Sequence, residues 1–93
     1  MIVRLRKAAL EDSLRAYYWY WLDDPARGQT FRASLRDAVA LVGEYPHIGS
    51  PREDGTRRVL LTGYPYVIVY RVGARSITVL AIRHTSRRPR SWR

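Results

Sequence analysis

The sequence predicts an α+β fold: an N-terminal strand, an antiparallel hairpin of two helices, a three-stranded antiparallel meander and a basic C-terminal tail. Apolar residues recur at helical spacing over residues 9–42 and at strand spacing from residue 58 onward. Tight turns separate these segments, and 93 residues suffice for a single domain, residues 1–93, with one core. One sheet with the helical hairpin packed on one face is the simplest architecture for these elements.

The first half of the chain contains a short strand, expected at residues 2–6, and two helices. In the first helix, residues 9–22, a stripe of large apolar side chains is expected to face the core: Leu10, Leu14, Tyr17, Tyr18 and Trp21. Asp24 suits the N-cap of the second helix and Pro25 its first position. The stripe of this second helix comprises Phe31, Leu35, Ala38 and Val42, and Gly43 is expected to end it.

The second half of the chain contains three expected strands, at residues 58–62, 66–72 and 77–83, because these segments are rich in β-branched and aromatic residues. The loops at 63–65 and 73–75 are short enough for hairpins, so the strands are expected to be antiparallel neighbours. A polar loop with several Pro and Gly residues, 46–56, connects them to the helices.

Charge is distributed unevenly along the chain, which has 17 Lys and Arg against 8 Asp and Glu and a formal net charge of +9. Residues 1–46 hold seven basic and six acidic side chains, a net +1, whereas residues 47–93 hold ten and two, a net +8. This asymmetry favours an anionic partner: nucleic acid, an acidic protein segment or an anionic membrane surface.

Composition excludes several other classes of protein. The chain has no Cys and two separate His residues, so we expect no disulfide, no metal site and no cofactor. We recognise no targeting segment, and the longest uncharged run, residues 59–70, is far shorter than the roughly 20 residues that span a bilayer. These observations predict a soluble, cytoplasmic protein without a membrane partner.

Arginines near the strand ends and in the tail are the candidate binding residues. The tail, residues 83–93, combines five Arg with His84 and Trp92, a set that suits phosphates and bases or an acidic protein surface. A solvated, frayed terminus is the alternative. Arg57 and Arg58 are expected to form one basic rim with this tail, unless they only protect an edge strand from aggregation.

His84 and the aromatic run 17–21 each have two interpretations. An imidazole among guanidinium groups suits a neutral general base, with Glu53 as a conceivable partner, or it is incidental to function. In the aromatic run, Trp19 falls opposite the expected core stripe, with Ala16 and Tyr20 beside it. This strip is expected to be exposed and to contact a protein, the alternative being an unusual core.

The order of elements and several motifs resemble the RelE/ParE superfamily of bacterial type II toxin–antitoxin toxins, over nearly the whole chain. The motifs are loose singly and fairly specific in their order and spacing. They are Leu10-Glu11-Asp12 before the aromatic run, Leu41 with Pro46 and Gly49, Gly55-Thr56-Arg57, residues 66–72, and residues 79–84 followed by Arg87-Arg88.

Two activities occur in the superfamily that this chain resembles. RelE-like members are metal-independent, ribosome-dependent mRNA endonucleases with an Arg before the Leu-Val-Tyr of the central strand, where this chain has Val67. ParE-like members poison DNA gyrase, and the strand 66–72 with the His-x-x-Arg-Arg ending favours this branch. The endonuclease alternative would use Glu53, Arg57, His84 and Arg87. A plain basic nucleic-acid-binding module is a third hypothesis.

The resemblance also implies partners. A cognate antitoxin, with an acidic C-terminal segment and often a ribbon-helix-helix DNA-binding domain, would form a hetero-oligomer with the chain through Ala16, Trp19 and Tyr20. The segment would fold on binding and be steered by the basic half. DNA gyrase is the expected target, contacted through Arg57, Arg58, Arg71, Arg83, His84, Arg87, Arg88 and Trp92.

Overall fold

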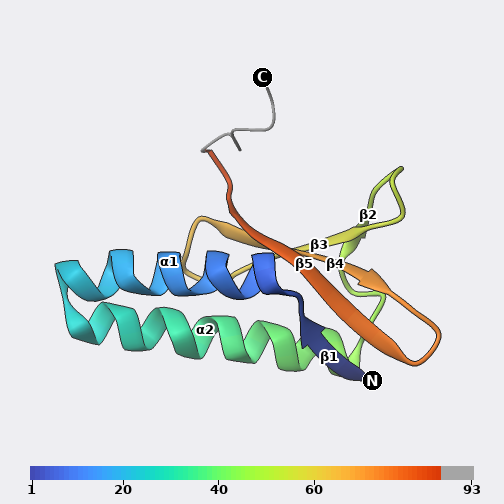
Figure 1. The fold of residues 1–93 in the computed structure, drawn as a ribbon, viewed down its shortest axis with the longest axis horizontal. Coiled ribbons are helices and arrows are strands. Elements are labelled where there is room, and N and C mark those ends of the chain that lie inside the picture. The colour runs from blue at the N-terminus through green and yellow to red at the C-terminus, as the bar shows by residue number, and fades with distance from the viewer. Residues whose placement is uncertain (87–93) are drawn as a thin grey trace.

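A computed structural model describes residues 1–86 and confirms the α+β class. Two helices and five strands follow one another along the chain (Figure 1). Their bounds are β1 (Ile2–Leu5), α1 (Lys7–Asp23), α2 (Pro25–Glu44), β2 (Ser50–Pro51), β3 (Arg57–Leu60), β4 (Tyr66–Val72) and β5 (Ser76–His84). Among the described residues, neither helix is long and apolar enough to cross a membrane.

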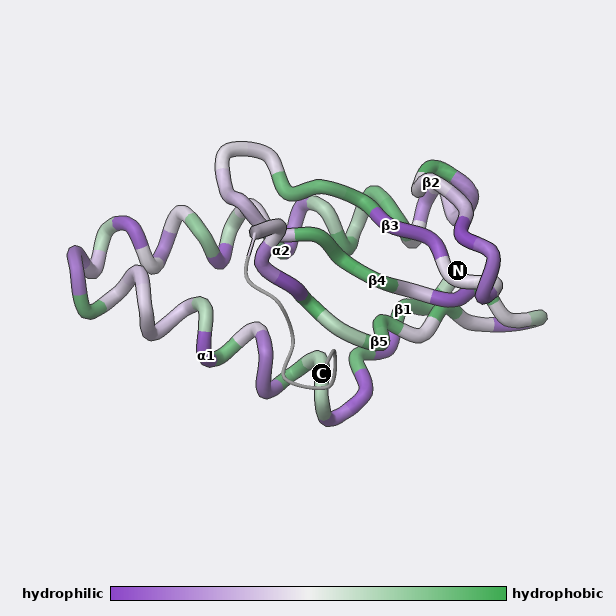
Figure 2. The backbone as a smooth tube through the Cα atoms, turned by 90° about the horizontal axis from the view of Figure 1, so that it is seen from above, coloured by the Kyte–Doolittle hydropathy of each residue, from purple (hydrophilic) through white to green (hydrophobic). Residues whose placement is uncertain are grey.

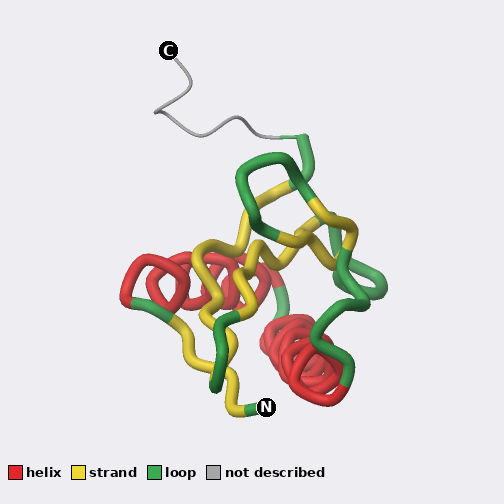
Figure 3. Tube along the Cα trace, turned by 90° about the vertical axis from the view of Figure 1, so that its right-hand side faces the viewer, coloured by secondary structure: helices red, strands yellow, loops and turns green. Residues whose placement is uncertain are grey.

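The strands form one sheet in the order β1-β5-β4-β3-β2. The expected meander is confirmed, since β3 pairs antiparallel with β4 and β4 with β5. The first strand lies beside the last one and runs parallel to it, with Ile2 opposite Ser76 and Leu5 opposite Val79. The two-residue strand β2, which the sequence did not predict, pairs with the start of β3. The sheet is twisted, as the view along the helices shows (Figure 3).

A tight turn at Asp24 joins the two antiparallel helices. The backbone N–H of Asp24 donates to the carbonyl of Tyr20, and its side chain accepts from the N–H of Ala26 at 3.0 Å. The predicted N-cap and the Pro25 start are therefore confirmed. Gly43 lies inside α2 rather than after it, in a place where a Cβ would be only 3.1 Å from Val3 Cγ2.

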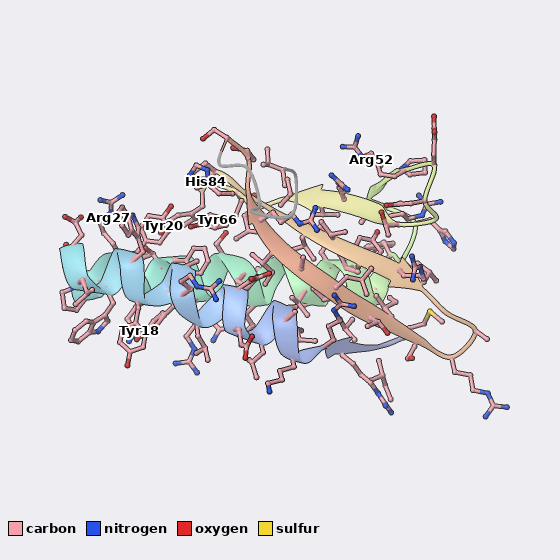
Figure 4. All side chains as sticks on the ribbon, turned by 45° about the horizontal axis from the view of Figure 1, so that its top comes forward. Tyr18, Tyr20, Arg27, Arg52, Tyr66 and His84 are labelled. Carbon is pink, nitrogen blue, oxygen red and sulfur yellow. The ribbon has the colours of Figure 1, made fainter. Side chains whose placement is uncertain are left out.

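Helix α1 packs on the sheet through a different face from the one predicted. Its buried residues are Ala9, Ser13, Ala16 and Tyr20. The expected core stripe is wrong for Leu10, Leu14, Tyr18 and Trp21, which are between 39% and 58% exposed. The reason is steric and polar: small side chains let the helix approach β5 closely, and the Asp12 carboxylate accepts from the Ile82 N–H at 3.0 Å. Tyr18 accordingly points away from the sheet (Figure 4).

An aromatic cluster joins the hairpin to the sheet. Tyr20 stacks on Phe31 with ring centroids 5.2 Å apart, and Tyr64 and Tyr66 meet both rings edge-on. Phe31 is completely buried, as the sequence predicted. Such pairs add about 0.5–1.5 kcal/mol each beyond area burial. The cluster therefore holds the part of the hairpin near the Asp24 turn against β4 and the loop before it.

The two helices approach each other closely at Gly28. A Cβ there would lie 2.8 Å from Trp21 Cβ and 3.0 Å from Trp21 Cα, closer than carbon atoms tolerate. Helix propensity alone favours Gly→Ala by about 1 kcal/mol. We nevertheless expect Gly28→Ala to destabilise the chain by about 1–3 kcal/mol, because the backbone of α1 must shift.

Urea denaturation checks this expectation, with Gln29→Ala, an exposed neighbour on the same helix, as the control. A Gly28→Ala variant more stable than wild type would show that the helices can separate at no cost.

Candidate binding surfaces

An apolar groove runs between α1 and α2, on the flank of the hairpin where the misassigned stripe lies. It encloses about 560 Å³. Its lining comprises Leu5, Leu10, Ser13, Leu14, Tyr17, Phe31, Arg32, Leu35, Arg36 and Val39. We call it the helix groove. Leu10 and Leu14 are each about half exposed, so the groove floor is an unpaired apolar surface.

The helix groove is basic as well as apolar. Two of its lining residues, Arg32 and Arg36, are positively charged, and none of them is acidic. Leu10, Leu14 and Tyr17 are spaced four and three residues apart on α1, the spacing with which an amphipathic helix contacts its partner. The groove therefore has the shape and charge to accept an acidic amphipathic segment.

A smaller cleft of about 250 Å³ lies on the other flank of α1, beside the end of β5. It is lined by Asp12, Arg15, Ala16, Trp19, Tyr66, Ile82 and His84. The predicted exposure of the aromatic strip is confirmed for Trp19, which is 64% exposed. It is wrong for Ala16 and Tyr20, which are 3% and 8% exposed, because both lie on the helix face that packs against the sheet.

His84 is held at the edge of this cleft. Its ring meets Tyr66 edge-on at 5.1 Å, and its Nδ1 accepts a hydrogen bond from the Ser86 N–H at 3.2 Å (Figure 4). An Nδ1 that accepts places the proton of the neutral ring on Nε2. Neither nitrogen of the neutral ring then offers a free lone pair, so this arrangement disfavours His84 as a general base.

The structure does not bring the candidate nuclease residues together. On β4, Arg57 pairs with Tyr70 and His84 pairs with Tyr66. The Cα atoms of Arg57 and His84 are therefore two strands and four residues apart, about 16 Å at usual strand spacing. The Arg57 guanidinium donates to the carbonyls of His47 and Gly49 instead, at 3.1 and 2.8 Å. Glu53 lies in the loop before β3, whose Arg52 is far from His84 in Figure 4. Arg87 lies outside the described residues.

Three of the predicted target-binding arginines share the sheet face that points away from the core. Side chains that alternate with the core residues of β4 and β5 face away from the helices. The core residues that face the helices are Ile68, Tyr70, Ile77, Val79 and Ile82. Arg4, Arg58, Arg71 and Arg83 occupy such alternate positions. We call this surface the open face; Figure 2 views the sheet from above.

The single basic rim that the sequence predicted is divided between the two sides of the sheet. Arg57 and Arg58 are consecutive residues of β3 and point to opposite faces. The same alternation separates Arg83, on the open face, from His84, beside Tyr66. The other predicted target contacts, Arg88 and Trp92, lie outside the described residues.

A turn at residues 52–56 borders the open face. The Asp54 carboxylate accepts from Thr56 Oγ1 at 2.6 Å and from the Thr56 N–H at 3.0 Å. These two hydrogen bonds, aided by the positive charges of Arg58 and Arg71, lower the pKa of Asp54 below its usual value. Arg71 also donates to the Asp54 carbonyl at 3.4 Å, which ties the turn to β4.

Sequence reasoning missed the helix groove because it assigned Leu10 and Leu14 to the core. The sequence contains a second stripe with the same 4-3-4 spacing as Leu10, Leu14, Tyr17 and Trp21, and this stripe could have indicated the buried face. It comprises Ala9, Ser13, Ala16 and Tyr20. Within residues 1–86, no three His, Cys, Asp or Glu side chains lie close enough to hold a metal ion.

Fold comparison defines the class of protein. A chain from the structure described as "Chromosomal ParDE TA system from P. aeruginosa" superposes with a TM-score of 0.81, covering 92% of this chain and 97% of that one. The two sequences are 20% identical, so this match shows a shared fold. The molecule is therefore an α+β domain with the fold of that ParDE chain.

Sequence comparison identifies the family. Residues 3–89 match the family model described as ParE toxin of type II toxin–antitoxin system, parDE. The Sinorhizobium fredii protein named "Putative toxin Y4kP" is 36% identical over 63 residues, which cover 67% of this chain and 65% of that protein. The chain thus spans slightly less than two thirds of that relative. The chain belongs to the ParE toxin family, and the resemblance drawn from its motifs is confirmed.

The Asp54 turn should make stability depend on pH in the acid range. The pKa of Asp54 is lower in the folded state than in the unfolded state. The ionised Asp54 carboxylate therefore stabilises the fold fully at pH values above the usual carboxyl pKa, and this stabilisation is lost as the pH falls through the lowered pKa of the folded state. We expect Asp54→Ala to destabilise the chain at pH near 7 and to approach wild-type stability in strong acid.

Urea denaturation at several pH values measures the difference between the two chains. A difference in the free energy of unfolding that stays the same at all pH values would contradict the proposal that the hydrogen bonds to the Asp54 carboxylate cause the stabilisation. The control is Glu53→Ala, because Glu53 is an exposed carboxylate in the same turn.

Proposed function

We propose that this chain is the toxin of a type II toxin–antitoxin pair, that it arrests growth by poisoning DNA gyrase in the cytoplasm, and that a cognate antitoxin neutralises it. The observation that supports gyrase over mRNA is the separation of Arg57 from His84 in a chain of the ParE family. Val67 at the position of the RelE-like arginine supports the same choice.

The helix groove is the proposed antitoxin site. Its apolar floor would bury the hydrophobic side of an incoming segment, and Arg32 and Arg36 would pair with carboxylates on the other side. A segment that folds on binding gains most from such a preformed surface. The toxin–antitoxin hetero-oligomer would thus be held by the acidic C-terminal part of the antitoxin, with a ribbon-helix-helix domain outside the groove.

Trp19 remains a second proposed antitoxin contact, because it is exposed beside the cleft on the opposite flank of α1. Tyr20 is no longer proposed, since the core covers it, and Ala16 stays proposed only as part of the cleft lining. The proposed gyrase contacts on the described residues are Arg58, Arg71 and Arg83. Arg87, Arg88 and Trp92 stay proposed contacts by family resemblance alone.

Purified DNA gyrase provides the direct test. We expect the full chain to abolish supercoiling of relaxed plasmid and to leave cleaved DNA, and we expect addition of the cognate antitoxin to restore supercoiling. Full supercoiling at saturating toxin would reject the gyrase proposal. A translating extract tests the endonuclease alternative. A ribosome-dependent endonuclease would cleave the mRNA in the extract, whereas a gyrase poison would leave that mRNA intact.

Antitoxin binding distinguishes the groove from the cleft. We expect Leu14→Glu to weaken antitoxin affinity about 100-fold, because it removes a buried apolar contact and places a charge in the groove. Leu22→Glu is the matched control, since Leu22 is 75% exposed on α1 and does not line the groove. Isothermal titration calorimetry with the antitoxin C-terminal peptide measures both.

Trp19→Ala in the same titration tests the second contact. If Leu14→Glu binds as tightly as wild type while Trp19→Ala does not, the antitoxin occupies the cleft and the groove proposal fails.

A further inference from the structure

The open face carries arginines from four neighbouring strands. Arg71 and Arg4 lie in one cross-strand row, because both pair with Thr78 from opposite sides. Arg58 lies in the next row, opposite Val69, and Arg83 in the row beyond, opposite Val67. None of the four forms an ion pair with a carboxylate among the described residues. The Asp54 carboxylate in the bordering turn offsets part of the charge of Arg58 and Arg71, so the described part of this face presents net positive charge.

The spacing of these arginines suits a chain of phosphates. With strands about 4.8 Å apart and alternate residues about 6.6 Å apart, the Cα atoms of neighbouring arginines are separated by roughly 8–12 Å. Long side chains adjust this by several ångströms. A nucleic-acid backbone places its charges in such a series, whereas a compact anion would meet one arginine only.

Arg58 holds a polar atom that the described fold leaves unsatisfied. Its Nε is buried and has no hydrogen-bond partner among the described residues, which favours a shift of this guanidinium toward an acceptor. A phosphate oxygen is such an acceptor once the side chain moves outward, and the planar fork of Arg binds phosphate in a bidentate manner.

The remaining residues of the open face select the kind of partner. The positions between and beside the arginines are Leu60, Val67, Val69, Thr78 and Ala81, and no aromatic ring lies among these described residues. Recognition of single strands relies on aromatic rings on which bases stack. Arginines over aliphatic residues fit contacts to a backbone rather than to bases.

We propose that the open face binds the phosphodiester backbone of duplex DNA without reading its sequence. The helix groove lies on the other layer of the fold, so DNA and the antitoxin helix would occupy different surfaces of the chain. This proposal goes beyond gyrase poisoning and does not require it, although an enzyme that works on duplex DNA would bring such a substrate to the toxin.

Fluorescence anisotropy with a short labelled DNA duplex and the purified full chain tests the proposal. Four phosphate contacts predict a slope of about −3.6 for the logarithm of the binding constant against the logarithm of salt concentration. We expect Arg58→Gln/Arg71→Gln to weaken binding about 30-fold or more at about 50 mM salt and to reduce the slope by about 1.8.

Arg32→Gln/Arg36→Gln is the matched control, because it removes the same charge from the helix groove. We expect this pair to retain duplex affinity within about twofold, apart from a small effect of net charge. Thermal unfolding of both double variants establishes that they are folded.

Several results would overturn the proposal. These are wild-type duplex affinity in Arg58→Gln/Arg71→Gln, an equal loss in the control pair, or a preference for single-stranded RNA that only the open-face variant loses. Loss of gyrase binding in the same variant, with its duplex affinity unchanged, would make the face a protein interface alone. Because the duplex assay contains no gyrase, its failure leaves the gyrase proposal standing, and failure of gyrase poisoning leaves this one standing.

Discussion

The close docking of α1 on β5 is the contact on which the rest of the structure depends. Ala9, Ser13 and Ala16 bring the helix near the strand, and the Asp12 carboxylate satisfies the Ile82 N–H where β1 has already ended. This contact determines the rotation of α1. Tyr20 consequently turns into the core against Phe31, and the larger apolar residues that follow Ala9 and Ser13 along the helix are left on its outer flank.

One rotation thus produces both surfaces of the hairpin. The flank with Leu10 and Leu14 borders α2 and forms the helix groove, whereas Trp19 on the other flank borders the cleft beside His84. The exposed leucines are a cost to the isolated chain, and a partner seated in the helix groove would recover it.

The alternation of side chains along the strands also determines which charged residues face outward. Because consecutive side chains point to opposite faces, Arg57 secures the loop at residues 47–49 while Arg58 faces outward, and His84 packs on Tyr66 while Arg83 faces outward. The basic half of the chain therefore supplies structure on one side and binding potential on the other. Three of its ten basic side chains, Arg58, Arg71 and Arg83, lie on the open face.

Local patterns were enough to predict the two helices, the Asp24-Pro25 turn and the meander, because caps, turns and periodicity act over a few residues. The order and spacing of the motifs were enough to indicate the family. Tertiary structure decided which stripe of α1 is buried, since two stripes had the same period and only contact with β5 distinguishes them. It also decided the parallel pairing of β1 with β5 and the distance between Arg57 and His84. These properties depend on pairing between residues far apart in the chain, which no local pattern encodes.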